Sequence, residues 1–207
     1  MVGGLGFGGE FWLPPPYLGV ARRARNETEA GVHHVYARGV ERRVIFLDED
    51  DWRLYLRLLR AVVEQFRWHL LGYCLMPNHV HLLVETRAPN LGKGMHMLHG
   101  LYAQLFNERY ERVGHLFQSR FGNREVQDEL GLAAVLGYVA VNPVAAGLCD
   151  SPGDWPWSSH REMTSGFAPS LIDVNRLRMH LAPIDDVPAC YDALIDERLS
   201  DALRGRA

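Results

Sequence analysis

The sequence is short of cysteine, of lysine and of long hydrophobic runs. Its 207 residues hold three cysteines, Cys74, Cys149 and Cys190, an odd number at wide spacing. Because disulfide frameworks and zinc sites need paired or closely spaced cysteines, we interpret these thiols as reduced and expect a cytoplasmic protein. No apolar run approaches the ~20 residues of a membrane-spanning helix, so no membrane partner is expected.

The amino terminus also lacks the pattern of a secretory signal. Residues 1–29 are rich in glycine and contain Pro14-Pro15-Pro16, but no positively charged flank precedes an apolar core. We expect this segment to be a disordered or extended leader. Residues 30–165 are expected to form one domain, and residues 166–207 an acidic, helical tail.

The charge does not identify a partner by itself. The formal net charge is −3, which argues against a protein that binds nucleic acid through overall charge alone. Only one of the 22 basic residues, Lys93, is a lysine. Arginine suits bidentate contact with phosphate, but a GC-rich genome produces the same preference, so composition leaves both explanations open.

Residue patterning predicts a mixture of strands and helices. Asp48 is a typical N-cap for a helix whose apolar residues recur at three-and-four spacing. Pro77-Asn78 is a turn signal between two runs of β-forming residues, which predicts a hairpin. The predicted strands are 32–38, 69–76 and 79–86, with 43–47 as a strand or extended arm, and 116–121 with 125–127 as a strand or hairpin turning at Gly122-Asn123. The predicted helices are 49–68, 95–112 and 131–141, the last ending before Pro143. A loop with Pro89, Gly92 and Gly94 is predicted before the second of these helices.

The stretch from Met76 to Glu85 is the most informative part of the chain. Side chains alternate between faces along a strand, so His79 and His81 point to one side while the residues between them point into a core. Two adjacent imidazoles can bind a metal ion, although three ligands are usually needed. The alternative is a pair of structural or surface histidines.

A second candidate group lies in the run from Tyr138 to Pro143. Tyr138 and Asn142 are four residues apart, so they share one helix face. The carbonyl oxygen of Asn142 is a ligand type suited to Mg²⁺ or Mn²⁺, and a tyrosine hydroxyl can attack a phosphodiester and become covalently linked to it. If this face lies across from the histidines, the two imidazoles and Asn142 hold a divalent ion next to Tyr138. Alternatively, Tyr138 is a core aromatic residue and Asn142 a helix-end residue.

Tyr102 is the rival nucleophile. Its neighbour four residues on is Phe106, which cannot bind a metal, and Tyr102 itself lies on the apolar stripe of its predicted helix. The spacing therefore favours Tyr138.

Several motifs together resemble the REP-associated tyrosine transposases, a branch of the single-tyrosine transposases among the His-hydrophobic-His endonucleases. They are Tyr73-Cys-Leu-Met-Pro-Asn-His-Val-His-Leu-Leu-Val-Glu85, the run from Tyr138 to Val144 followed by Ala146-Gly147-Leu148, and Trp155-Pro-Trp-Ser-Ser159. Weaker matches are His34-Val35 with Arg38-Gly39, and the run from Phe117 to Phe121. The resemblance covers residues 30–162.

The resemblance implies a ferredoxin-like α+β domain, in which an antiparallel sheet carries the histidines and a helix presents the tyrosine. It implies cleavage of single-stranded DNA beside a palindromic hairpin, through a 5′-phosphotyrosine and a free 3′-hydroxyl that can be rejoined to another end. By motif match, His79, His81 and Asn142 would hold Mg²⁺ or Mn²⁺, and Tyr138 would be the nucleophile. No nucleotide cofactor is implied, and a monomer and a homodimer both stay open.

Three further residues are candidates for DNA contact. Trp155 and Trp157 can stack on unpaired bases, or their segment can pack back on the domain. Arg120 can contact a backbone phosphate or form a surface ion pair. We interpret five other histidines as structural or exposed, namely His33, His34, His96, His99 and His115.

Two other functions compete with that of a transposase. One is a hairpin-binding protein of the same fold without turnover, against which the intact set of candidate site residues speaks. The other is a metal-dependent hydrolase of small phosphoesters that uses bound water, in which a tyrosine next to the metal has no role. A covalent adduct with hairpin DNA would distinguish the transposase from both.

Overall fold

The computed structural model describes residues 28–165, 170–182 and 187–204, so nearly all of the predicted leader lies outside the described residues. The strands are Gly31–Arg38 (β1), His69–Met76 (β2), His79–Thr86 (β3) and Gly122–Val126 (β4). The helices are Glu49–Phe66 (α1), Leu91–Arg109 (α2), Glu129–Ala145 (α3), His160–Ser165 (α4), Val174–Leu181 (α5) and Val187–Arg204 (α6), with 3₁₀ turns at Val40–Arg42 (η2) and Pro152–Asp154 (η3). Among the described helices, none is long and apolar enough to cross a membrane.

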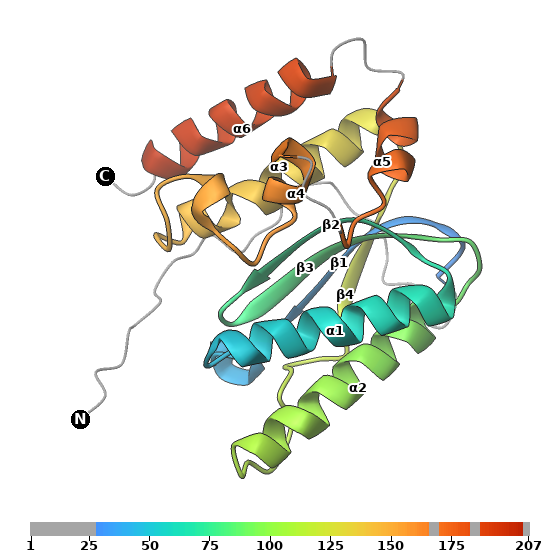
Figure 1. Ribbon diagram of the computed structural model, residues 1–207, viewed down its shortest axis with the longest axis vertical. Helices are drawn as coiled ribbons and strands as arrows, with labels where there is room; N and C mark the ends of the chain where they lie inside the picture. Colours follow the sequence, from blue (N-terminus) through green and yellow to red (C-terminus); the bar gives the residue numbers. More distant parts are fainter. Residues whose placement is uncertain (1–27, 166–169, 183–186, 205–207) are drawn as a thin grey trace.

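The four strands form one antiparallel sheet in the order β2-β3-β1-β4. Along the chain, β1, α1, β2, β3, α2 and β4 follow one another, and with this strand order they make the ferredoxin-like arrangement. Figure 1 shows α1 and α2 on one face of the sheet, and α3 with the later helices on the other. The predicted α+β fold with an antiparallel sheet and packed helices is therefore confirmed.

Strand alternation divides the sheet into two faces of different character. The face toward α1 and α2 is the main core, in which Val35 and Leu82 from the sheet are buried with Tyr55 and Tyr102 from the helices. The opposite face packs against α3 through a smaller apolar cluster that includes Leu83. This second face also carries His79 and His81 of β3, so the fold places polar side chains between the sheet and α3.

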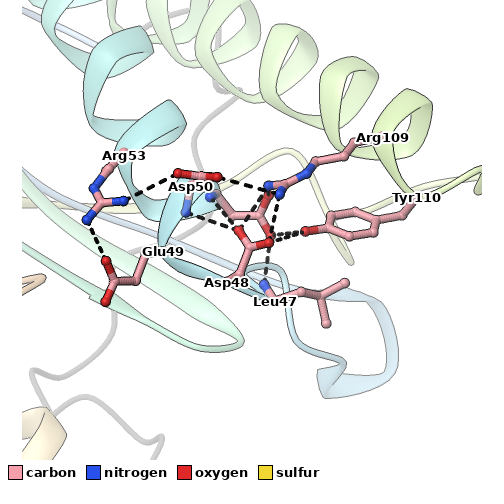
Figure 2. A network of polar contacts seen from close by, with 8 residues as sticks. Leu47, Asp48, Glu49, Asp50, Arg53, Arg109 and Tyr110 are labelled. Carbon is pink, nitrogen blue, oxygen red and sulfur yellow. Dashed lines mark hydrogen bonds and ion pairs between the residues drawn. The ribbon is translucent and has the colours of Figure 1, made fainter.

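A network of charged side chains joins the start of α1 to the end of α2, as Figure 2 shows. Asp48 caps α1 as predicted, because its carboxylate accepts hydrogen bonds from the backbone N–H groups of Asp50 and Asp51. The carboxylate of Asp51 is buried and accepts from Arg109 Nη1 at 2.8 Å and from the Tyr110 hydroxyl at 3.0 Å. Both helices are thus held in one relative position over the sheet.

Helix α2 begins at Leu91, four residues before the predicted start, so the prediction of a loop there was wrong. The two glycines that suggested a loop lie within the first turn of the helix. Gly94 is required by packing, since a Cβ atom there would lie 2.2 Å from the ring of Trp68. Asn90 holds the same ring by accepting from Trp68 Nε1 at 2.7 Å.

The predicted hairpin at Gly122-Asn123 is absent, because both residues lie inside β4. Gly122 pairs with Tyr36 of β1, and a Cβ atom at Gly122 would lie 2.3 Å from the Tyr36 ring. Residues 116–121 contribute only an isolated bridge between Phe117 and Gly39. Residues 43–47 form the extended arm that the sequence left open, and Ile45 N–H donates to the carbonyl of Pro77.

Helix α3 continues through Pro143 to Ala145, so the predicted end at residue 141 was wrong. Proline removes one backbone hydrogen bond and its ring crowds the carbonyl four residues earlier, but here Pro143 lies in the last turn of the helix. The helix then closes normally, with Ala146 N–H donating to the carbonyl of Asn142 at 3.0 Å. Asn142 therefore lies within the helix and keeps its place one turn after Tyr138.

Candidate active site

The two histidines of β3 lie side by side on the face of the sheet toward α3. In the pairing of β1 with β3, His79 is opposite Arg38 and His81 is opposite Tyr36. Both imidazoles are buried, and their ring centroids are 5.0 Å apart. Helix α3 crosses this face and places the Tyr138 ring 5.6 Å from that of His81. The structure thus brings the predicted histidines and the predicted nucleophile together on one side of the sheet.

The Nδ1 atom of each histidine has a hydrogen-bond partner. His79 Nδ1 lies 2.6 Å from Asn78 Oδ1, and His81 Nδ1 lies 3.0 Å from His34 Nε2. Because an amide oxygen only accepts, His79 Nδ1 carries the proton and Nε2 presents a lone pair. Among the described residues, no group partners either buried Nε2 atom. Two orphaned imidazole nitrogens on one face fit a divalent metal ion.

The surroundings keep both imidazoles neutral, which is the form that binds metal. Burial lowers the pKa of His79 to about 3, and the nearby charge of Arg38 acts in the same direction. Burial also lowers the pKa of His81 well below its ordinary value, with further contributions from His79, His34 and Arg38.

Asn142 supplies an amide on the same helix face as Tyr138. Its Nδ2 group donates to the backbone carbonyl of Tyr138 at 2.8 Å, which fixes the amide beside that residue. In the described part of the chain, no three His, Cys, Asp or Glu side chains gather into a metal site. A metal held by His79 and His81 therefore needs a ligand of another type, and the amide oxygen of Asn142 is the type predicted.

Tyr138 is half-buried, with positive charge nearby. Burial raises the pKa of its phenol, while a hydrogen bond from Asn142 and the charges of Arg198 and Arg38 lower that pKa in part. The guanidinium of Arg198, on α6, lies 5.8 Å from the centre of the Tyr138 ring. These groups favour the negative charge that a phenol acquires when it reacts as a nucleophile.

Tyr102, the rival tyrosine, lies on the opposite face of the sheet. Its side chain is fully buried in the main core beside Tyr55 of α1, and its hydroxyl donates to the carbonyl of Ile45. Burial raises the pKa of this phenol further from neutrality. The rival is thus a core aromatic residue with a satisfied hydroxyl, as its place on the apolar stripe indicates.

His34 belongs to this site, although its sequence context gave no ligand pattern. It is buried on β1, its ring stacks on His81 with centroids 5.2 Å apart, and it meets the edge of Tyr138 at 6.2 Å. Burial lowers its pKa to about 4, with Arg124 acting in the same direction. The pairing of β1 with β3 makes His34 a neighbour of His81, and the sequence does not reveal which strands pair.

Of the three residues predicted to contact DNA, the two tryptophans pack against the domain and Arg120 is exposed. Trp155 donates from Nε1 to the carbonyl of Leu75, and Trp157 stacks on Trp52 of α1 with centroids 5.2 Å apart. Both tryptophans therefore pack back on the domain, which is the alternative that the sequence left open. Arg120 is exposed near the start of β4, and its carbonyl accepts from His99 Nδ1 at 3.1 Å.

Comparisons with known proteins identify the family. A REP-associated tyrosine transposase of Haemophilus influenzae is 28% identical over 124 residues, which are 53% of this chain and 69% of that protein. A solved structure of a REP-associated tyrosine transposase bound to a REP hairpin superimposes with a TM-score of 0.60 at 15% identity, covering 76% of this chain and 93% of that one. At this identity, the structural match shows a shared fold. The family model described as "Transposase IS200 like" matches residues 28–142, more than half of the chain, with β1, the histidine pair, Tyr138 and Asn142 inside the match, and the chain belongs to that family.

Proposed function

We propose that this protein cleaves and rejoins single-stranded DNA next to palindromic hairpins, with Tyr138 as the nucleophile. The observation that carries the proposal is the position of Tyr138 against His81, which adjoins His79, and the buried Nε2 atoms of both histidines have no partner among the described residues. The REP hairpin bound by the structural neighbour supports hairpin DNA as the substrate. A metal-dependent hydrolase that uses water would leave the tyrosine without a role.

The proposed reaction exchanges one phosphate ester for another. The Tyr138 oxygen attacks a backbone phosphorus, the bond from phosphorus to the 3′ oxygen breaks, and the phenol proton passes to that oxygen. The products are a 5′-phosphotyrosine and a free 3′-hydroxyl. Attack by a 3′-hydroxyl on the phosphotyrosine reverses these steps and joins DNA ends.

The side chains around Tyr138 have separate tasks in this scheme. Arg198 and Arg38 lie near the phenol and favour the phenolate over the neutral form. His79, His81 and Asn142 would hold Mg²⁺ or Mn²⁺, which when bound polarises a phosphoryl oxygen and stabilises the charge that develops there. His34 orients His81 through the bond between their ring nitrogens.

Adduct formation tests the proposal directly. The protein is incubated with Mg²⁺ or Mn²⁺ and end-labelled hairpins drawn from repeated palindromes of the host genome, and the products are separated under denaturing conditions. We expect a labelled protein band that contains phosphotyrosine, together with a free 3′-hydroxyl on the released strand. Hairpin binding without an adduct would instead indicate a non-catalytic binding protein, and release of inorganic phosphate from small esters would indicate a hydrolase.

A further inference from the structure

A cavity of about 670 Å³ lies between α2 and the segment 114–121, which leads into β4. This volume is within the usual range for sites that hold small molecules or parts of larger ones, roughly 300–1,000 Å³. The cavity is on the α2 side of the molecule, so it is separate from the site around Tyr138. Arg120, which was predicted to contact a DNA phosphate, is among the residues that line it.

The lining of the cavity is positive in a protein that is negative overall. Lys93, the single lysine of the chain, and Arg120 both line it, together with the exposed side chains of His96 and His115. Of the described residues that line the cavity, none is Asp or Glu. With a formal net charge of −3 for the whole chain, this concentration of basic groups favours a ligand that carries phosphate.

One wall of the cavity is aromatic and rigid. Phe117 stacks on His99, with ring centroids 4.2 Å apart and planes at 21°. His99 donates from Nδ1 to the carbonyl of Arg120, so its Nε2 accepts from the Tyr55 hydroxyl at 3.1 Å. Burial lowers the pKa of His99 to about 4, so the ring is neutral. Phe117 remains partly exposed, and a flat aromatic surface beside cations suits a base with its phosphate.

Backbone hydrogen bonds connect this wall to the strand end next to the histidines. Gln118 N–H donates to the carbonyl of Arg38 at 2.8 Å, and Val40 N–H donates to that of Leu116 at 2.9 Å. Gly39 N–H in turn donates to the carbonyl of Asn78, the residue directly before β3, at 2.9 Å. The segment from Arg38 to Val40 therefore borders both the cavity wall and the strand that begins with His79.

We propose that this cavity binds an unpaired nucleotide of the single-stranded DNA that flanks the hairpin. The base lies against Phe117, and the phosphate lies toward Lys93 and Arg120. An unpaired base is required, since a base inside a duplex has no free face for stacking. The inference rests on the proposed function in one respect, because it takes the substrate to be hairpin DNA with single-stranded flanks.

The probe is a labelled palindromic hairpin with single-stranded flanks on both sides, compared with the same hairpin whose flanks are abasic. The abasic probe keeps every phosphate and sugar, so it isolates the contribution of the bases. From the usual strength of base stacking on aromatic side chains, we expect the intact flanks to bind about ten-fold more tightly. Fluorescence anisotropy in the Tyr138→Phe variant measures both affinities without cleavage.

Gly100 allows the cavity to be filled without disturbing the protein. It lines the cavity from α2, it is exposed, and a Cβ atom added there would meet no atom within 4 Å. Leucine is also a better helix former than glycine, so Gly100→Leu is expected to fold. We expect this variant to bind intact and abasic flanks with equal affinity. Gln104→Leu, one turn further along α2 and outside the lining, is the matched control and should keep the ten-fold preference.

The results separate this inference from the proposed function. If Gly100→Leu keeps the preference for intact flanks, or if the parent protein shows no preference or no binding, the cavity does not hold a nucleotide. If both variants lose the preference, leucine on α2 acts through the helix and the assignment to the cavity also fails. Absence of a covalent adduct with the parent protein would refute Tyr138 chemistry alone, because the affinities are measured without cleavage.

Discussion

Tyr138 and Tyr102 differ in what surrounds the hydroxyl group. Tyr138 is half-buried beside His81 and Arg198, whereas the Tyr102 hydroxyl is buried and bonded to the carbonyl of Ile45. We expect Tyr138→Phe to keep the fold and hairpin binding and to abolish both the covalent adduct and strand joining. Tyr102→Phe should form the adduct at close to the parental rate and should cost ~1 kcal/mol of stability through the lost hydrogen bond. The opposite pattern in the adduct assay would show that the nucleophile lies on α2.

His79 carries a buried Nε2 atom that has no partner among the described residues. His79→Ala removes one imidazole of the predicted metal site, so cleavage that depends on Mg²⁺ or Mn²⁺ should fall by at least about a hundred-fold. Hairpin binding should persist, since most contacts to DNA are made to its backbone by other groups. Cleavage at the parental rate in this variant, measured with and without chelator, would remove His79 from the ligand set.

His34 tests how far the site extends beyond its proposed ligands. Its Nε2 lies 3.0 Å from His81 Nδ1, so it can accept the proton of that nitrogen and leave His81 Nε2 as a lone pair. His34→Leu should weaken binding of Mn²⁺ about ten-fold, as measured by electron paramagnetic resonance, because partners of metal ligands typically contribute that much. His34→Gln keeps an acceptor and should restore most of the affinity. Equal affinities for both variants would mean that His34 only fills space.

At the scale of elements, local sequence patterns were sufficient to predict those helices and strands whose ends are set by neighbouring residues. The hairpin of residues 69–76 and 79–86 was predicted at its observed bounds, because a Pro-Asn turn separates two runs of β-forming residues. The cap at Asp48 was likewise recognisable from residue type alone. The period of a strand was enough to place His79 and His81 on one face of the sheet. The period of a helix was enough to place Tyr138 and Asn142 on one face of α3.

The failures have tertiary causes. Gly94 and Gly122 suggested a loop and a turn, but each makes room for an aromatic ring from another element, Trp68 and Tyr36 respectively. Pro143 suggested a helix end, yet in the last turn of α3 a proline disturbs few backbone hydrogen bonds. His34 could be connected with His81 only through strand pairing over 47 positions of sequence. Sequence periods reveal which face a residue occupies, but they do not reveal which element covers that face.

The junction of α1 and α2 should be a stability determinant that is separate from the site. Asp51 is buried and accepts hydrogen bonds from Leu47 N–H, Tyr110 and Arg109. Asp51→Ala leaves the Leu47 N–H without its acceptor and leaves the Tyr110 hydroxyl only the longer bond to Asp48, so we expect the free energy of unfolding to fall by ~2–3 kcal/mol in urea denaturation. Asp50→Ala, at an exposed position of the same turn, is the control and should change it by less than ~1 kcal/mol. Similar losses in both variants would mean that the network is not what joins the helices.

At the scale of the whole molecule, the described part of the tail covers the face that holds the site. Helix α6 packs along α3, and its Arg198 reaches Tyr138. Helix α5 is attached to the edge of the sheet, where Asp173 at its start accepts from His69 at 2.7 Å. Figure 1 shows both helices on the α3 side. Tyr138, the proposed nucleophile, thus lies between a sheet from the family domain and a helix that lies beyond the matched residues 28–142.

The attachment of α5 should depend on pH through Glu85. This carboxylate, at the end of β3, accepts from Arg176 Nε at 2.6 Å and from His180 Nε2 at 2.8 Å. Hydrogen bonds from Arg176, the largest influence, and from His180 lower its pKa to about 2. Because the folded pKa lies below the unfolded one, Glu85 stabilises the fold above the unfolded pKa, and this contribution is lost as pH falls from about 5 to about 2.

Glu85→Gln removes the titrating group while keeping the shape of the side chain. We expect the variant to be less stable than the parent at neutral pH by ~2 kcal/mol, and the difference to shrink as pH falls through the window set by the two pKa values. Urea denaturation at a series of pH values measures both quantities. Glu108→Gln, on the exposed side of α2, should give a curve parallel to that of the parent. If the Glu85→Gln curve is also parallel, the ion pair does not hold α5 to the sheet, and the attachment rests on the other contacts, including that between Asp173 and His69.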